Sequence, residues 1–198
     1  MRTNNAGYTV KVWDGVVRAC HWGLVATFSA LYVTAHNGMQ NTHMLLGYLL
    51  TLLLGIRLVW GFVGSKHARF SDFSYRPSQV LAYLQAGLQG RAQHYLGHNP
   101  AGAMMVFALL IVLLSLSLSG LILQAGIEFE GPLLPLLHGM ADDAVYLWEA
   151  LHRFMSNAML ALIALHLMGV AGASIQHHEN LIRAMLSGYK SPPLKKSK

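Results

Sequence analysis

Charged residues and cysteines are both scarce in this 198-residue chain. Only 11% of the residues are charged, whereas 54% are apolar, and a water-soluble globular domain usually carries about 25% charged residues. The scarcity of charge therefore argues against a soluble domain. The single cysteine, Cys20, excludes an internal disulfide, a four-cysteine metal site and a covalent CxxCH haem attachment. With 11 histidines in the chain, nitrogen ligands must hold any metal or cofactor.

Four apolar stretches are long enough to cross a bilayer, which requires about 20 mostly apolar residues in a helix. We place these spans near 16–36, 43–63, 101–124 and 151–174. The third contains no charged residue, and each of the others contains one arginine, close enough to a helix end for its side chain to reach the interface. The sequence therefore predicts an all-α, integral membrane four-helix bundle that forms a single domain over residues 1–198.

Lysine and arginine are unevenly distributed among the segments that connect the spans. Segments 1–15, 64–100 and 175–198 hold 11 of them, whereas 37–42 and 125–150 hold none. Because cytoplasmic loops carry an excess of these residues, both termini are expected to face the cytoplasm. The net charge of +6 then reflects topology, and nucleic acid is not an expected partner. Residues 188–198 are predicted to form a basic, flexible tail.

Helical patterns also occur outside the spans. Ser78 to Leu88 and Glu179 to Leu186 both place apolar residues at helical spacing, which predicts two short interfacial helices. Asp142 has the character of an N-cap, so the fourth helix is expected to begin well before its membrane span. Asn37 and Gly38 predict the turn after the first span.

Four histidines fall within the spans, where ionisable side chains are functional candidates by default. They are His21, His43, His152 and His166. His152 and His166 are 14 residues apart, so their rings face the same side of a helix about 21 Å apart along its axis. One metal with ligands about 2 Å away cannot be reached by both. The spacing therefore favours two cofactors.

Depth in the membrane suggests how these histidines pair. His21 and His166 lie about 9 and 12 Å inside the cytoplasmic ends of their helices, and we call this pair the inner site. His43 and His152 open their spans at the opposite face, and we call this pair the outer site. Bis-histidine haem b fits two such pairs best, because two imidazoles fill both axial positions of the iron. A rival scheme replaces His43 by His36, whose register with His21 is poorer but acceptable.

The surroundings of these histidines suit a flat macrocycle. Gly47 lies about one turn from His43, and Gly169 and Gly172 lie one and two turns from His166, so a porphyrin could approach the backbone. Arg18 and Arg153 are candidates to pair with haem propionates, with interfacial anchoring as an equally weighted alternative. Hydrogen bonding to neighbouring helices is the alternative role for the four histidines. The other histidines of the connecting segments are predicted to be solvated or interfacial, namely His67, His94, His98, His138, His177 and His178.

Five stretches of the chain resemble a known family. They are VWDGVVRACHW (12–22), HMLLGY (43–48), RLVWGFVGSKHARFSDF (57–73), GHNPAG (97–102) and LHRFMSNAMLALIALHLMGV (151–170). Over about residues 8–187 the chain resembles the bacterial di-haem cytochrome b-561 family, which includes the cytochrome b subunits of nickel-iron hydrogenases. The resemblance implies two haems b, with His21, His43, His152 and His166 as ligands, and so favours His43 over His36.

The resemblance also implies that electrons pass between a periplasmic redox partner and membrane quinone. We therefore expect a di-haem electron-transfer subunit whose partner is a c-type cytochrome or a hydrogenase, with a bound quinone as a further ligand. Residues near the inner site that could contact quinone are Lys11, Asp14, Trp22, Trp60, His177 and His178.

Two other functions remain as alternatives. The first is an enzyme in its own right, a superoxide:quinone oxidoreductase of the same fold. A positively charged funnel would support it, but Arg153 is the only basic residue near the acidic outer loop. The second is a haem-free transporter or scaffold, and the lack of broken spans disfavours a transporter of the repeat type.

Overall fold

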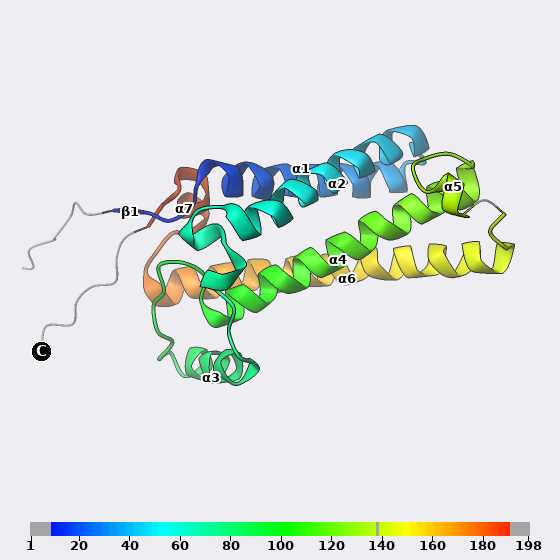
Figure 1. Ribbon diagram of the computed structural model, residues 1–198. Coiled ribbons are helices and arrows are strands. Elements are labelled where there is room, and N and C mark those ends of the chain that lie inside the picture. Colours follow the sequence, from blue (N-terminus) through cyan, green and yellow to red (C-terminus); the bar gives the residue numbers. More distant parts are fainter. Residues whose placement is uncertain (1–8, 138, 191–198) are drawn as a thin grey trace, which may run out of the picture. The chain divides into compact units, whose positions relative to one another are not determined.

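Four long helices make up most of the chain. The computed structural model describes residues 9–137 and 139–190 (Figure 1). Each long helix is apolar and long enough to cross a membrane, which confirms the four predicted spans. They are α1 (Gly15–His36), α2 (Gln40–Val63), α4 (Pro100–Leu123) and α6 (Asp142–His177). α4 continues into a π-helical turn, η3 (Gln124–Glu128).

Shorter elements occupy the connections and the chain ends. Two of them, α3 (Pro77–Leu88) and α7 (Leu181–Ser187), confirm the short helices predicted from apolar spacing. α6 begins before its predicted span, as expected, but Asp142 lies in its first turn and not at the N-cap position, and the turn at Asn37 and Gly38 follows α1 directly. The remaining elements are η1 (Lys66–Ala68), η2 (Phe70–Asp72), α5 (Leu134–Leu137) and an antiparallel pair of strands, β1 (Val10–Lys11) and β2 (Tyr189–Lys190).

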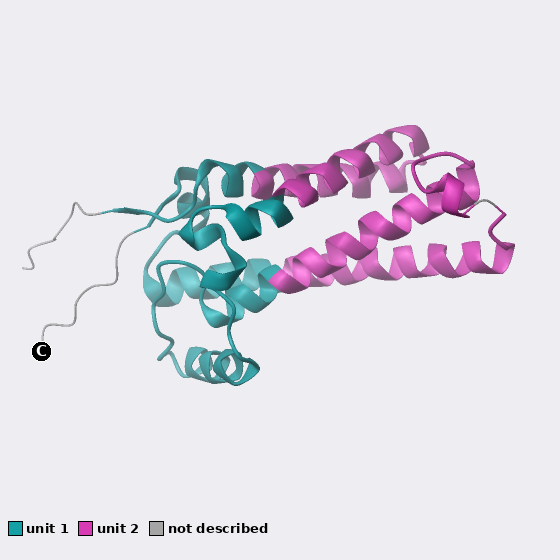
Figure 2. Cartoon of the chain, viewed as in Figure 1, with its two compact units in different colours: residues 1–19, 57–106, 165–198 teal, residues 20–56, 107–164 magenta. Residues whose placement is uncertain are grey.

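The chain divides into two compact units (Figure 2). The first unit comprises residues 1–19, 57–106 and 165–198, and the second comprises 20–56 and 107–164. Each of the four long helices contributes one segment to each unit. Of the predicted tail at 188–198, Tyr189 and Lys190 form β2, and residues 191–198 lie outside the described residues.

Many large apolar side chains of the long helices point outward. Leu45, Phe62 and Ile175 are 69%, 73% and 75% exposed. Exposed apolar surface on this scale is unusual for a soluble protein, but it is what a helix presents to lipid tails. The exposed side chains therefore agree with the assignment of the long helices to a membrane.

The first unit has a small core at the start of α1. Val12, Trp13, Val17 and Ala68 are buried together there. Asp14 caps α1, because its Oδ1 accepts a hydrogen bond of 2.8 Å from the Val17 N–H. Its Oδ2 accepts from Trp60 Nε1 at 2.9 Å and from Ser65 Oγ at 2.5 Å. Burial raises the pKa of Asp14, but these hydrogen bonds together outweigh it, so the pKa lies below its ordinary value.

Replacing Asp14 by alanine should destabilise the first unit. Loss of the cap should lower the free energy of unfolding by about 1–2 kcal/mol, measured as a lower Tm in detergent at pH 7. Because the folded-state pKa of Asp14 is depressed, its stabilisation is complete above the ordinary value of 3.8 and is lost as the pH falls through the folded-state pKa. The Tm values of wild type and variant should therefore converge in acid.

Asp143→Ala provides the control for this prediction. Asp143 lies in the first turn of α6, and its Oδ1 accepts from the adjacent Ala144 N–H at 2.9 Å. Its loss should lower the Tm by less than the loss of Asp14. Equal decreases for the two variants at pH 7 would contradict the role assigned to Asp14.

Candidate functional site

The turn between α1 and α2 places His43 against the end of α1. Gly38 adopts a φ of +66°, which glycine tolerates without a steric penalty, and α2 begins two residues later. His43 Nδ1 then lies 3.0 Å from the carbonyl oxygen of Leu31. Because a carbonyl oxygen can only accept, Nδ1 must carry the hydrogen. The lone pair of the neutral imidazole is therefore on Nε2, the form that a metal ligand needs.

His152 on α6 reaches the same tautomer through a side chain of α4. Its Nδ1 lies 2.8 Å from Ser119 Oγ, and the same hydroxyl lies 3.1 Å from the Leu116 carbonyl oxygen. A serine hydroxyl has one hydrogen, so both contacts are hydrogen bonds at the same time only if Ser119 donates to the Leu116 carbonyl and accepts from His152 Nδ1, and we adopt this arrangement. The lone pair of His152 is then also on Nε2.

The rings of His43 and His152 lie next to each other within the second unit. Their centroids are 6.4 Å apart and their planes are inclined by 75°. Two imidazoles that share one metal, each bonded at about 2 Å, have centres about 6 Å apart. The separation and the tautomers therefore suit a shared metal.

Other features of the second unit favour haem iron over a metal held by protein alone. Among residues 9–137 and 139–190, no three His, Cys, Asp or Glu side chains lie together as a metal-binding group. A structural zinc site takes four protein ligands, whereas haem iron takes two axial ones. A Cβ on Gly47, one turn from His43, would meet nothing within 4 Å, so the backbone leaves open space there. The residues present fit haem b.

His36, the rival ligand, has a different environment. Its ring is exposed and packs on Tyr32, with centroids 4.2 Å apart. Its Nδ1 lies 2.9 Å from the Tyr32 carbonyl oxygen, one turn back along α1. The second unit thus places the ring of His43 beside His152, and His36 at the exposed end of α1.

The predicted ligands of the inner site belong to different units. His21 lies in the second unit, where its ring contacts Trp22 edge-on at 5.0 Å. His166 lies in the first unit, one turn before Gly169, where a Cβ would meet nothing within 4 Å. The pairing of His21 with His166 therefore stays a prediction from the sequence.

The two predicted propionate partners have unlike surroundings. Arg18 is packed against the turn after α7, since a Cβ on Gly188 would lie 3.4 Å from its Cδ and Nη1. Its Nε is buried and has no hydrogen-bond partner among the described residues, which leaves it a donor to offer. The side chain of Arg153 is 69% exposed and lies 3.3 Å from Glu149 on the same helix. Its surroundings suit the interfacial role.

The residues predicted to contact quinone have the following surroundings. Asp14 and Trp60 lie together but bond to each other. The ring of His177 packs edge-on against His94, with centroids 5.2 Å apart. Lys11 is part of β1 and Trp22 is 37% exposed, while His178 has a left-handed backbone with a φ of 51°.

Two histidines that were predicted to be solvated or interfacial lie in packed surroundings of the first unit. His94 Nε2 lies 3.2 Å from Glu179 Oε2, which also binds Lys190 Nζ at 3.2 Å, and the side chain of Lys190 is 5% exposed. The ring of His98 lies 4.7 Å from that of Trp13 and 4.3 Å from that of Phe73. Burial above all, with the nearby charge of Arg57, lowers the pKa of His98 to about 3. Neither histidine is therefore freely solvated.

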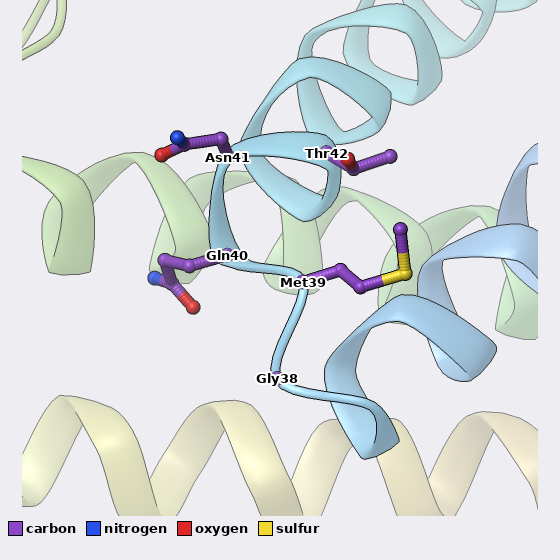
Figure 3. A pocket seen from close by; sticks show the side chains of 5 residues that line it. All are labelled: Gly38, Met39, Gln40, Asn41 and Thr42. Atoms are coloured by element: carbon purple, nitrogen blue, oxygen red, sulfur yellow. The ribbon is translucent and has the colours of Figure 1, made fainter.

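A pocket of about 380 Å³ lies at the turn between α1 and α2. It is lined by residues 38–42, and Figure 3 shows Gln40 and Asn41 on one side of the turn and Met39 and Thr42 on the other. None of these side chains is ionisable, so the pocket offers no acid, base or charged group for chemistry.

Comparisons with known proteins agree with the helical membrane fold. Residues 12–188 match the family described as prokaryotic cytochrome b561. A relative from Azotobacter chroococcum mcd 1, named a probable Ni/Fe-hydrogenase B-type cytochrome subunit, is 25% identical over 91% of this chain and 88% of its own length. Relatives with the same name from Azotobacter vinelandii and Bradyrhizobium diazoefficiens are 25% and 23% identical, each over 91% of this chain and over 88% and 85% of their own lengths.

No solved structure significantly matches the chain. The family match nevertheless covers nearly its whole length and includes all four membrane-spanning helices. The chain therefore belongs to the prokaryotic cytochrome b561 family, and it is a multi-pass b-type cytochrome of electron transport in the bacterial inner membrane.

Proposed function

We propose that this chain holds two haems b and relays electrons across the membrane between a periplasmic redox partner and the quinone pool. The observation that carries the proposal is the outer site. There the ring centroids of His43 and His152 lie 6.4 Å apart, and each ring has a hydrogen bond at Nδ1. Haem iron, when bound, supplies a one-electron carrier. The protein supplies the ligands, their orientation and the apolar surroundings.

The outer site is prepared for a metal by its hydrogen bonds. The Leu31 carbonyl and the Ser119 hydroxyl hold the two rings in the Nδ1–H form, so neither has to change tautomer when it binds iron. Gly120 lies beside this site, since a Cβ there would be 3.5 Å from His152 Cε1. An alanine at position 120 would thus be in ordinary van der Waals contact with the ring.

The inner site in this proposal consists of His21 and His166. Their spacing along the sequence places them at similar depths below the cytoplasmic ends of their helices. The bias of lysine and arginine supports cytoplasmic termini, and the inner site then lies on the side where we expect quinone to react. Arg18 is three residues before His21 and has a buried Nε available for a propionate.

The relatives suggest the redox partner. Those reported above are named B-type cytochrome subunits of Ni/Fe-hydrogenases, and they align with more than nine-tenths of this chain. We therefore propose a hydrogenase as the first candidate donor at the outer face, and a c-type cytochrome as the second. The acidic residues of 125–150 would favour a partner with a basic surface.

A relay is better supported than a superoxide:quinone oxidoreductase. An anionic substrate requires positive charge near the outer site. Segments 37–42 and 125–150 contain no lysine or arginine, and Arg153 is paired with Glu149. The charge around the outer site therefore does not favour superoxide.

Substitution of each ligand should remove one haem. We expect two haems per wild-type chain, and one in each of the variants His43→Ala, His152→Ala, His21→Ala and His166→Ala, because one imidazole does not retain haem b securely. The measurement is haem quantification of the purified protein, with reduced-minus-oxidised spectra.

His36→Ala is the matched control, since His36 lies on α1, as His21 does, but its side chain is exposed. It should retain both haems. Full haem content in His43→Ala together with loss in His36→Ala would select the rival ligand. Two haems in all four ligand variants would refute the proposed sites.

The purified chain should not turn over rapidly with superoxide as the sole electron donor. A relay needs its partner protein at the outer face, so quinone reduction should be slow until a reduced donor protein is added. The measurement is the rate of quinone reduction in proteoliposomes, with His152→Ala as the inactive control. Fast, partner-independent turnover that disappears in this control would instead establish the oxidoreductase.

A further inference from the structure

Ser119 has a position that ligand spacing alone does not explain. Its side chain is 2% exposed, on the face of α4 that meets α6, and its hydroxyl forms a two-step chain of hydrogen bonds. His152 Nδ1 donates to Ser119 Oγ at 2.8 Å, and Ser119 donates to the Leu116 carbonyl oxygen at 3.1 Å. Water is largely excluded at such burial, so this hydroxyl is well placed to act on the ligand.

We infer that Ser119 is a positioning residue that lowers the reduction potential of the outer site by hydrogen bonding to His152. This inference rests on the proposed function, because it requires His152 to be an axial ligand. It adds a residue that acts through the ligand without touching iron.

The physical basis is the polarisation of the imidazole. An acceptor on Nδ1–H draws the proton away from the ring, which raises the electron density at Nε2 and makes it a stronger ligand. A hydroxyl that is itself donating is a better acceptor, because hydrogen bonds in a chain strengthen one another. A stronger donor ligand stabilises the oxidised more than the reduced iron, so the potential falls.

The Nδ1 hydrogen bonds of the two proposed outer-site ligands have different kinds of acceptor. His43 donates to the main-chain carbonyl of Leu31 at 3.0 Å, a bond that no side-chain substitution removes, and the Thr34 hydroxyl lies farther from the same nitrogen, at 3.4 Å. His152 donates to a side chain, so the strength of its hydrogen bond depends on which residue occupies position 119. Ser119 is thus a place where substitution can change the potential without changing either ligand.

Ser117 provides a matched control on the same helix. Its hydroxyl is also buried, with the residue 8% exposed, but it has no hydrogen-bond partner among the described residues. Ser117→Ala and Ser119→Ala therefore remove the same atom from the same helix, and only the second removes a hydrogen bond to His152. Ser119→Thr keeps a hydroxyl at position 119 and serves as the rescue variant.

The test is a potentiometric titration of the purified full chain, with the electron paramagnetic resonance spectrum of the oxidised protein. In Ser119→Ala we expect both haems to be retained and one of the two redox components to move to a more positive potential. A tenfold change in its equilibrium constant corresponds to about 59 mV for one electron. The signal of the same haem should shift, while Ser117→Ala and Ser119→Thr should resemble the wild type.

The redox component whose potential shifts in Ser119→Ala should be the one that is missing from His152→Ala. Loss of that haem in Ser119→Ala alone, with both haems retained in Ser117→Ala and Ser119→Thr, would also support the assignment, because the hydroxyl would then hold the ligand in place. Three results would overturn the role assigned to Ser119: Ser119→Ala titrates as the wild type does, Ser117→Ala shows an equal shift in potential, or the shift occurs in the redox component that His152→Ala retains. Failure of the proposed function itself is distinct, because His152→Ala would then retain two haems.

Discussion

The single hydrogen on each imidazole of His43 and His152 is the constraint on which the second unit depends. A neutral histidine inside a membrane span must place this N–H on an acceptor, because an unpartnered polar group in apolar surroundings is costly. Leu31 on α1 provides one acceptor and Ser119 on α4 the other. These two bonds connect α2 to α1 and α6 to α4, and they decide which nitrogen of each ring is left for a metal.

Lipid makes such bonds more important to packing than they would be in water. The apolar side chains of the long helices, among them Leu45 and Ile175, face outward at little cost, so burial of apolar surface does little to drive helices together. Small residues and polar contacts take over that role. Gly120 brings α4 close to the ring of His152, and Tyr48 on α2 donates to Gln124, the first residue of η3.

Hydropathy and apolar periodicity were enough to predict the four spans, α3, α7 and the early start of α6. Depth matching predicted that His43 and His152 would be neighbours, because two straight helices of known length leave little freedom.

Ser119 could not be found this way, since the face of α4 that meets α6 depends on tertiary packing. The surroundings of His94 and His98 were missed because a histidine in a connecting segment is usually exposed to solvent. Their partners, Glu179 and Trp13, come from distant parts of the sequence.

Charge is divided between the two units in a way that suits histidine as the proposed ligand. The first unit holds 13 of the 14 lysines and arginines and three of the eight acidic residues, and there a buried lysine can be paired with a carboxylate, as Lys190 is with Glu179. Residues 20–56 of the second unit contain no charged residue at all. A carboxylate or thiolate ligand would bring a negative charge into that region without a fixed partner. Neutral imidazoles bring none, so hydrogen-bonded histidine is the ligand type that this part of the chain can accommodate.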